Sequence, residues 1–151
     1  MNRVIIKNDI LCTVYSCGED GKVKSWSILN KRLKYEFNHG NNVEDIVIGR
    51  RGTPLAGRLL SINYEGCRIS SSETGAEIKT IKYSCYSIAV DKAQTVIAVG
   101  TGYKVAFIET TNFTQIKEVF VNDYVYSLAF NKRNDRMVAV TKNGEIHSLK
   151  F

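Results

Sequence analysis

The chain has 151 residues, of which 44% are hydrophobic and 24% charged, which is typical of one folded domain and excludes disorder throughout. Its net charge of +6 permits nucleic acid, an anionic membrane surface or an acidic protein as partner, without selecting one. Near the start, Lys7, Asn8 and Asp9 interrupt the apolar residues before they form a signal-peptide core. No stretch approaches the roughly 18 apolar residues of a membrane helix. We therefore expect a soluble intracellular protein, cytoplasmic or nuclear.

Apolar runs in this chain are short, rich in Val, Ile, Tyr and Phe, and bounded by Gly, Asn or Asp, which predicts an all-β fold. Four segments share one plan: an apolar run, a polar turn, a second run, a Gly-containing turn and a third run. The first runs are Val4 to Ile6, Val43 to Ile48, Tyr86 to Val90 and Val125 to Phe130. The second runs are 13–18, 59–63, 95–100 and 136–141, and each forms a predicted hairpin with the run that follows it.

The third runs superpose Trp26, Ser70, Ile108 and Leu149, which are spaced by 44, 38 and 41 residues. This period is close to the roughly 40–45 residues of a four-stranded propeller blade. A fourth run follows the first three repeats, at 33–37, 76–82 and 114–120, and is absent after the last. The sequence therefore predicts a partial or small β-propeller of about 3.75 blades. We expect one domain over residues 1–151, with blades at approximately 1–37, 43–82, 85–120 and 124–151.

One segment resembles the WD-repeat family, whose blades carry an Asp-Gly turn, alternating apolar positions and a Trp. It runs from Asp20 to Trp26, followed by Ser27 where the family usually has Asp. His39 precedes the second blade, where the family has a Gly-His pair. The resemblance implies a WD-repeat β-propeller in which a His, a Ser or Thr, an Asp and the Trp form a buried network.

That network is incomplete in every repeat. Ser16, Asp20 and Trp26 supply three members in the first blade but no His precedes it, and the second blade combines His39 and Ser61 with neither Asp nor Trp. Because half-satisfied polar networks specify structure poorly, we expect the blades to rely on apolar packing, with Trp26 in the core.

The number of repeats is too small for a ring of the family's usual size. About seven blades close such a ring and need roughly 280 residues at this repeat length. Three explanations remain: a fragment or split half completed by another chain, a dimer with an eight-bladed ring, or a compact four-bladed form. We favour incompleteness, because the last strand, 145–151, would leave an unpaired edge that a partner strand could cover.

The two ends of the blades differ in predicted charge. An up-and-down meander places the loops after the first and third strands at one end, where ten basic residues meet five acidic ones. The candidate phosphate-binding residues there are Arg50, Arg51, Arg58, Lys132, Arg133 and Arg136. They would bind RNA, an anionic lipid or an acidic protein segment by neutralising charge. The alternative is a solvated basic rim.

The opposite end is rich in tyrosine: Tyr64, Tyr83, Tyr103 and Tyr124 lie in or beside its turns. Tyrosine offers rigid apolar area with a polar tip, which suits protein or peptide contacts. The alternative is that these rings pack across neighbouring blades.

Catalytic motifs are missing from the sequence. The two histidines lie in separate blades, His147 being a structural or solvent-facing residue, and there is neither a Gly-x-Ser-x-Gly motif nor a phosphate-binding Gly loop that opens a helix. Four cysteines, Cys12, Cys17, Cys67 and Cys85, lack the spacing of a zinc site and the density of a disulfide scaffold, so we expect small core residues.

We therefore predict no enzyme, metal or cofactor. The sequence favours a non-catalytic protein-interaction scaffold or assembly subunit, completed by a partner chain or by self-association. The alternative is a phosphate-binding module that uses the basic end for RNA or anionic lipid.

Overall fold

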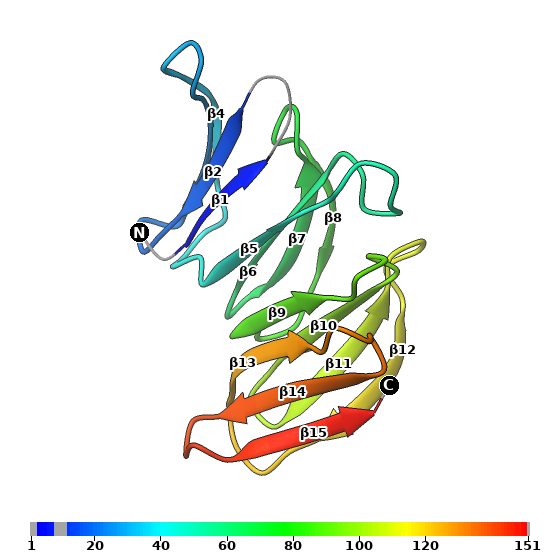
Figure 1. Ribbon diagram of the computed structural model, residues 1–151. Coiled ribbons are helices and arrows are strands. Elements are labelled where there is room, and N and C mark those ends of the chain that lie inside the picture. Colours follow the sequence, from blue (N-terminus) through cyan, green and yellow to red (C-terminus); the bar gives the residue numbers. More distant parts are fainter. Residues whose placement is uncertain (1–2, 8–11, 151) are drawn as a thin grey trace.

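The computed structural model describes residues 3–7 and 12–150, and all regular structure in them is β (Figure 1). None of these residues belongs to a helix long and apolar enough to span a membrane. The strands form four antiparallel sheets, three of four strands and one of three. In every sheet, strands that follow one another in sequence are neighbours, as expected for a meander. The predicted all-β partial propeller of about 3.75 blades is confirmed.

Sheet 1 consists of β1 (Arg3–Lys7), β2 (Thr13–Cys17), β3 (Lys22–Ser27) and β4 (Arg32–Asn38). Sheet 2 consists of β5 (Asp45–Ile48), β6 (Arg58–Asn63), β7 (Gly66–Ser71) and β8 (Glu77–Ile81). Sheet 3 consists of β9 (Ser87–Val90), β10 (Val96–Gly100), β11 (Lys104–Glu109) and β12 (Gln115–Phe120). Sheet 4 consists of β13 (Val125–Phe130), β14 (Arg136–Thr141) and β15 (Ile146–Lys150). That residues 1–151 form one domain with the blade boundaries given above stays a prediction.

The Gly-containing turns produce the hairpins that the sequence indicates. Gly21, between β2 and β3, has a φ of +71°, and a Cβ there would lie 2.6 Å from the carbonyl oxygen of Gly40. Only glycine fits such a left-handed position so close to another backbone. Asp20 adds a turn contact, since its Oδ1 accepts from the Lys22 amide at 3.2 Å. The turn therefore fixes which residues of β2 and β3 pair.

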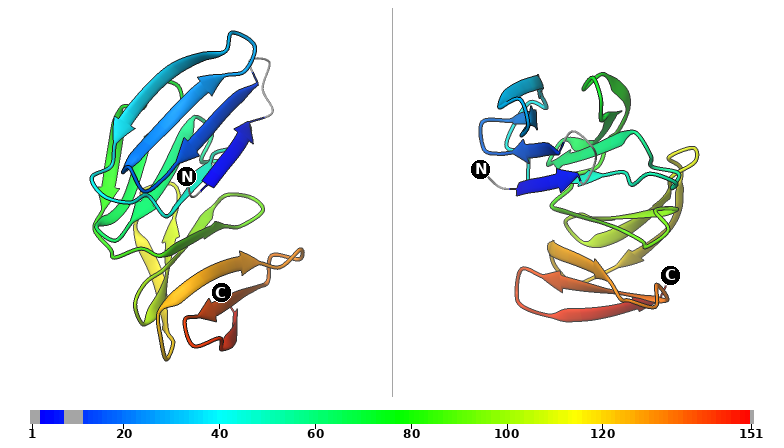
Figure 2. Two further views of the ribbon diagram at one scale, coloured as in Figure 1. Left: turned by 90° about the vertical axis from the view of Figure 1, so that its left-hand side faces the viewer. Right: turned by 45° about the horizontal axis from the view of Figure 1, so that its top comes forward.

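The four sheets follow one another along an arc, from the blue sheet 1 to the red sheet 4 (Figures 1 and 2). The first strand of each sheet is innermost, so β1 lies beside β5, β5 beside β9 and β9 beside β13. Sheets 2 and 3 therefore each have one face toward the preceding sheet and one face toward the following sheet.

Three apolar clusters fill the spaces between successive sheets. Tyr15, Val23, Ile46 and Leu59 belong to the cluster between sheets 1 and 2. Leu60, Ile69, Ile88 and Ile97 belong to the cluster between sheets 2 and 3. Phe107, Leu128 and Met137 belong to the cluster between sheets 3 and 4. Burial of apolar area, at about 25 cal/mol per Å², is the main force that holds the arc together.

Two faces have no neighbouring sheet among the described residues: the first face of sheet 1 and the last face of sheet 4. Trp26 lies on the uncovered face of sheet 1 and is 39% exposed, so the expectation that it lies in the core is wrong. Its position in the repeat is a core position, but burial there requires a preceding sheet.

The buried polar network implied by the family resemblance is not formed in sheet 2. His39 Nδ1 and Ser61 Oγ are buried and have no hydrogen-bond partner. In sheet 1, the Asp20 carboxylate instead accepts hydrogen bonds from the backbone amide of Lys22 and, at 3.1 Å, from the ammonium of Lys24. The sheets accordingly depend on apolar packing.

The cysteines are free thiols, and three of them, Cys17, Cys67 and Cys85, are buried while Cys12 is half-buried. Burial raises the pKa of Cys67 to about 12, so its thiol stays protonated at neutral pH. Their expected role as small core residues is confirmed for the three buried thiols.

Candidate functional site: an open groove with two unlike ends

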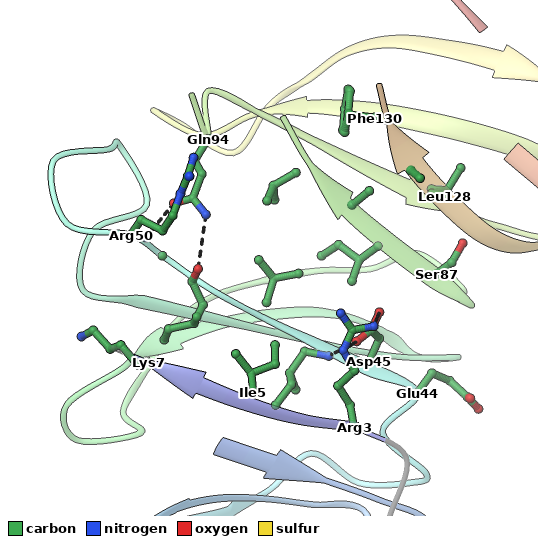
Figure 3. Close-up of a pocket in the computed structure, with 18 of the residues that line it drawn as sticks. Arg3, Ile5, Lys7, Glu44, Asp45, Arg50, Ser87, Gln94, Leu128 and Phe130 are labelled. Carbon is green, nitrogen blue, oxygen red and sulfur yellow. Dashed lines mark hydrogen bonds and ion pairs between the residues drawn. The ribbon is translucent and has the colours of Figure 1, made fainter. Parts of the chain in front are cut away.

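A groove of about 1560 Å³ runs along the inner strands on the concave side of the arc (Figure 3). Side chains from β1, β5, β9 and β13 line it, together with residues of the loops at either end. Its middle is apolar, with Ile5, Leu128 and Phe130 among the lining residues. Consecutive residues of the inner strands, such as 86–90 and 126–130, line the groove, because these strands present an edge and not one face to it. Concave surfaces lined mainly by apolar side chains are the usual location of binding sites in proteins.

An ion pair lies in the groove near the start of β1 (Figure 3). Arg3 Nε lies 3.3 Å from Asp45 Oδ1, and Arg3 Nη1 donates to Asp45 Oδ2 at 3.4 Å. Burial raises the pKa of Asp45 and the Arg3 guanidinium opposes that shift. The pair joins sheet 1 to sheet 2 and gives this end of the groove a fixed polar contact.

A tyrosine cluster occupies the same end of the sheets, beside sheets 3 and 4. The rings of Tyr103 and Tyr124 have centroids 5.3 Å apart, and those of Tyr86 and Tyr124 are 5.4 Å apart and nearly perpendicular. The Lys142 ammonium lies 5.9 Å from the Tyr124 ring centroid. Tyr86 and Tyr126 line the groove, so the cluster continues into it. The cluster therefore places an aromatic surface at the mouth of the groove.

Two tyrosines at this end are open to solvent. Tyr103 of the cluster and Tyr126 of the groove lining are each 56% exposed. The proximity of Tyr124 raises the pKa of Tyr103, so its hydroxyl stays protonated at neutral pH. An exposed tyrosine in contact with a half-buried one, as Tyr103 is with Tyr124, has the rigid amphipathic character of an interface residue.

The structure brings together only two of the four tyrosines predicted from sequence, Tyr103 and Tyr124. Tyr64 is exposed on the turn between β6 and β7, where its hydroxyl oxygen accepts a hydrogen bond from the side-chain Nδ2 of Asn41. Tyr83 is half-buried between sheets 2 and 3. Its hydroxyl donates to Gln115 Oε1, and the Lys104 ammonium lies 5.9 Å from the centroid of its ring. The predicted alternative of packing between blades therefore describes Tyr83.

Side-chain hydrogen bonds join the loops of sheets 2 and 3 at the basic end. Gln94 Oε1 accepts from the Arg50 amide and from Thr53 Oγ1, both at 2.7 Å, and Gln94 Nε2 donates to the Ile48 carbonyl at 3.3 Å. The Arg50 guanidinium donates to the Lys92 carbonyl. The loop that carries Arg50 is therefore fixed against its neighbour, and part of the Arg50 donor capacity is used within the protein.

The other sheets are fastened at the same end. The Lys92 amide donates to Asn134 Oδ1 at 2.9 Å, which joins sheet 3 to sheet 4. The hydroxyls of Tyr15 and Tyr35 donate to the Ser72 carbonyl at 2.9 and 3.0 Å, which joins sheet 1 to sheet 2. Every pair of successive sheets thus has a polar link at the basic end.

The six basic residues predicted from sequence lie at this end, in two loops and at the starts of two strands. Arg51, Lys132 and Arg133 are exposed in loops, while Arg58 is half-buried at the start of β6 and Arg136 is exposed at the start of β14. Sheet 3 stands between the loop of Arg51 and that of Arg133. The six residues therefore belong to sheets 2 and 4, and Lys92 of sheet 3 joins their loops by accepting from Arg50 and donating to Asn134.

Sequence reasoning missed Arg3, Tyr86, Gln94 and Tyr126 as site residues. Tyr86 and Tyr126 stand at the start of the first runs of their repeats, a position that the meander places at the tyrosine end. Their position in the repeat could therefore have predicted that they lie at the tyrosine end. Gln94 gave no signal, because its role depends on a loop 44 residues away.

The described residues that line the groove supply charged groups and hydroxyl groups. Its lining contains neither histidine nor cysteine, and its best-defined charged pair is Arg3 with Asp45. Within residues 3–7 and 12–150, no group of three or more His, Cys, Asp or Glu side chains could hold a metal ion.

Comparison with known proteins shows the fold. No protein-family model and no curated protein sequence matches the chain. Among solved structures, it is similar to Sqt1 of Saccharomyces cerevisiae, a β-propeller, with a TM-score of 0.83 and 13% identity over 99% of this chain and 46% of that one. It is also similar to the hydrazine synthase of Kuenenia stuttgartiensis, with a TM-score of 0.78 and 15% identity over 91% of this chain and 42% of that one. The chain thus spans less than half the length of either neighbour.

Proposed function

We propose that the protein is a non-catalytic, intracellular protein-interaction scaffold that binds a partner protein at the tyrosine end of its groove. The observation that carries this proposal is the aromatic cluster of Tyr86, Tyr103 and Tyr124 at the groove mouth. Exposed Tyr126 extends it into the groove. Aromatic residues that are held rigidly beside a concavity are enriched among the residues that dominate binding energy.

The composition of the groove supports a protein partner. Apolar side chains from the middle of the inner strands would contact apolar residues of the partner, and the Arg3–Asp45 pair would offer polar contacts at the same end. An apolar centre with a polar rim is the usual anatomy of a protein interface.

The proposal of a non-catalytic role is supported by what lines the groove. Without a histidine or cysteine there, a nucleophile would lack the usual base, and the lining arginines and carboxylates include the mutually neutralised pair Arg3 and Asp45. The fold itself does not decide this point, because one structural neighbour is named as an enzyme.

The test is affinity capture with the chain as bait, followed by measurement of Kd for each recovered partner after purification. We expect Tyr103→Ala and Tyr126→Ala each to weaken binding by about 2 kcal/mol, roughly 30-fold, as for central interface residues. Both side chains are more than half exposed, so the midpoint of thermal unfolding should not change.

Ile116→Ala is the matched control, because Ile116 is 58% exposed on the outer strand β12, away from the groove lining. It should leave the Kd of the partner unchanged. Equal binding by the two tyrosine variants and the native chain would contradict the proposal.

A second candidate function is phosphate binding at the basic end, which the hydrogen-bonded loops favour. Gln94 holds the loop of Arg50 and Arg51 in one conformation, so the exposed Arg51 would not need to be ordered on binding. RNA or anionic vesicles should then bind with an affinity that falls steeply as salt rises, because released counterions drive the association. Absence of binding at low salt, or binding that Arg51→Glu leaves intact, would exclude this function.

A further inference from the structure

The uncovered face of sheet 1 has the composition of an interior face. Ile6, Val14 and Trp26 are paired across β1, β2 and β3 and form one apolar row on this face. Ile6 is 66% exposed and Trp26 39% exposed. A shallow hollow of about 510 Å³, lined in part by Val4, Val14 and Trp26, lies on the same face.

The register shows that the same row packs against a neighbouring sheet in the other three sheets. The equivalent residues are Ile48, Leu59 and Ser70 in sheet 2, Val90, Ile97 and Ile108 in sheet 3, and Phe130, Met137 and Leu149 in sheet 4. In each of these sheets the row packs against the sheet that precedes it, and its central residue is fully buried. Sheet 1 therefore presents a surface that elsewhere in this molecule always contacts another sheet.

The uncovered face of sheet 4 is equivalent to the faces that contact a following sheet. Val140 and Ile146 are paired there, and Ile146 is 72% exposed. The equivalent pairs are Cys17 with Val23, Ile62 with Cys67, and Gly100 with Val105. All six of these residues are buried against the next sheet. The two uncovered faces are thus the two complementary halves of one repeated interface.

We propose that two copies of this chain associate head to tail, with the last face of sheet 4 of each copy packed on the first face of sheet 1 of the other. The interface continues the one already formed three times, between sheets 1 and 2, 2 and 3, and 3 and 4. A heterologous interface of this kind generates a closed ring when its rotation closes. Two copies bring together eight sheets.

The hollow on sheet 1 accommodates the exposed residue of sheet 4. Ile146 holds the position of Val105, which packs in the cluster with Leu128 and Ala139 of the following sheet. The positions of Leu128 and Ala139 correspond in sheet 1 to Val4 and Ser16, and both of these line the hollow. Association would therefore bury Ile146 of one copy against Val4 of the other.

Association also changes the groove. In one copy the inner strands line a groove that is open along one side, while in a pair of copies a second set of inner strands faces the first. A ligand of the groove would then be enclosed by residues of both copies. Association of two copies is therefore a different proposal from the binding of a partner protein at the tyrosine cluster.

The first experiment is light scattering coupled to size-exclusion chromatography on the 151-residue chain at micromolar concentration. The proposal requires the mass of two copies, twice the 17.0 kDa of the chain. A mass of one copy, or a mass that continues to grow with concentration, would overturn it.

The second experiment separates the head-to-tail interface from any other dimer. Ile6→Asp blocks the face of sheet 1 and Ile146→Asp blocks the face of sheet 4, so each variant alone should be a monomer. Both residues are exposed within one copy, and circular dichroism should show unchanged folding. Mixing the two variants restores one intact interface and should give a complex of one copy of each.

Ile116→Asp is the matched control, since it places the same charge at an exposed Ile outside both faces, and it should remain a dimer. If Ile146→Asp stays dimeric while Ile6→Asp is monomeric, the interface joins two copies of the sheet 1 face, and the proposal is wrong. Retained dimers in both single variants would also contradict it.

Discussion

Sheets 1 and 2 have the same row of apolar positions on their first faces but a different neighbour. Val4 in sheet 1 and Ile46 in sheet 2 are each paired with a serine of the next strand, Ser16 and Ser61. Ile46 is fully buried because sheet 1 covers it, whereas Val4 is 46% exposed. The difference shows that the repeat specifies a face fit for packing, while the presence of a preceding sheet decides whether that face is buried.

The largest expected difference between the two sheets comes from truncation of the buried residue. Ile46→Ala should lower the free energy of unfolding by about 3 kcal/mol, since it removes buried methyl groups and leaves a cavity. Urea denaturation followed by fluorescence measures this loss. A change below about 1 kcal/mol would mean that sheets 1 and 2 are not packed as described.

A smaller effect is expected at the joint between the two sheets, where His39 is half-buried. Burial and the nearby Arg68 lower the pKa of His39 to about 4, against the opposing influence of Glu65 and Glu77. The unfolded chain therefore takes up the proton more readily. Stability due to neutral His39 is full above about pH 6.5 and is lost as the pH falls toward 4, by about 1–2 kcal/mol.

The check is urea denaturation at several pH values between 7 and 4, with His39→Asn for comparison. The variant should lose less stability across this range than the native chain. Parallel pH profiles would contradict a buried neutral imidazole at this joint.

The smallest effect is expected on the uncovered face. Val4→Ala, measured in the Ile146→Asp chain so that association does not contribute, should change the free energy of unfolding by less than about 0.5 kcal/mol. A loss as large as that of Ile46→Ala would show that the face of sheet 1 is already covered within one copy.

The sequence was sufficient to predict the strands and their order, because period, turn glycines and alternation are local signals. The aligned positions Trp26, Ser70, Ile108 and Leu149 do occupy the same place in the four sheets. The exposure of Trp26 was not predictable from its own repeat, since it depends on a neighbouring sheet.

The candidate site was predicted in part. The meander predicted a tyrosine end and a basic end, but the contact of Tyr86 with Tyr124 depends on side-chain packing between successive sheets. The bonds of Gln94 to Arg50 and Thr53 cross between sheets, and no spacing in the sequence encodes them. Contacts between loops that are far apart in the sequence therefore limit how much of the site can be predicted from the sequence alone.

The polar links at the basic end have a consequence for the curvature of the arc. Successive sheets are joined by the chain itself at the tyrosine end and by hydrogen bonds of Tyr15, Gln94 and Asn134 at the basic end. Two separated attachments, together with the apolar layer between the sheets, restrict the rotation of neighbouring sheets relative to each other. Gln94 holds its link from a left-handed backbone conformation with a φ of +57°, which costs a non-glycine residue roughly 1 kcal/mol. These few side chains therefore contribute, with the apolar layers, to the radius of the arc and hence to the number of sheets that would complete a circle.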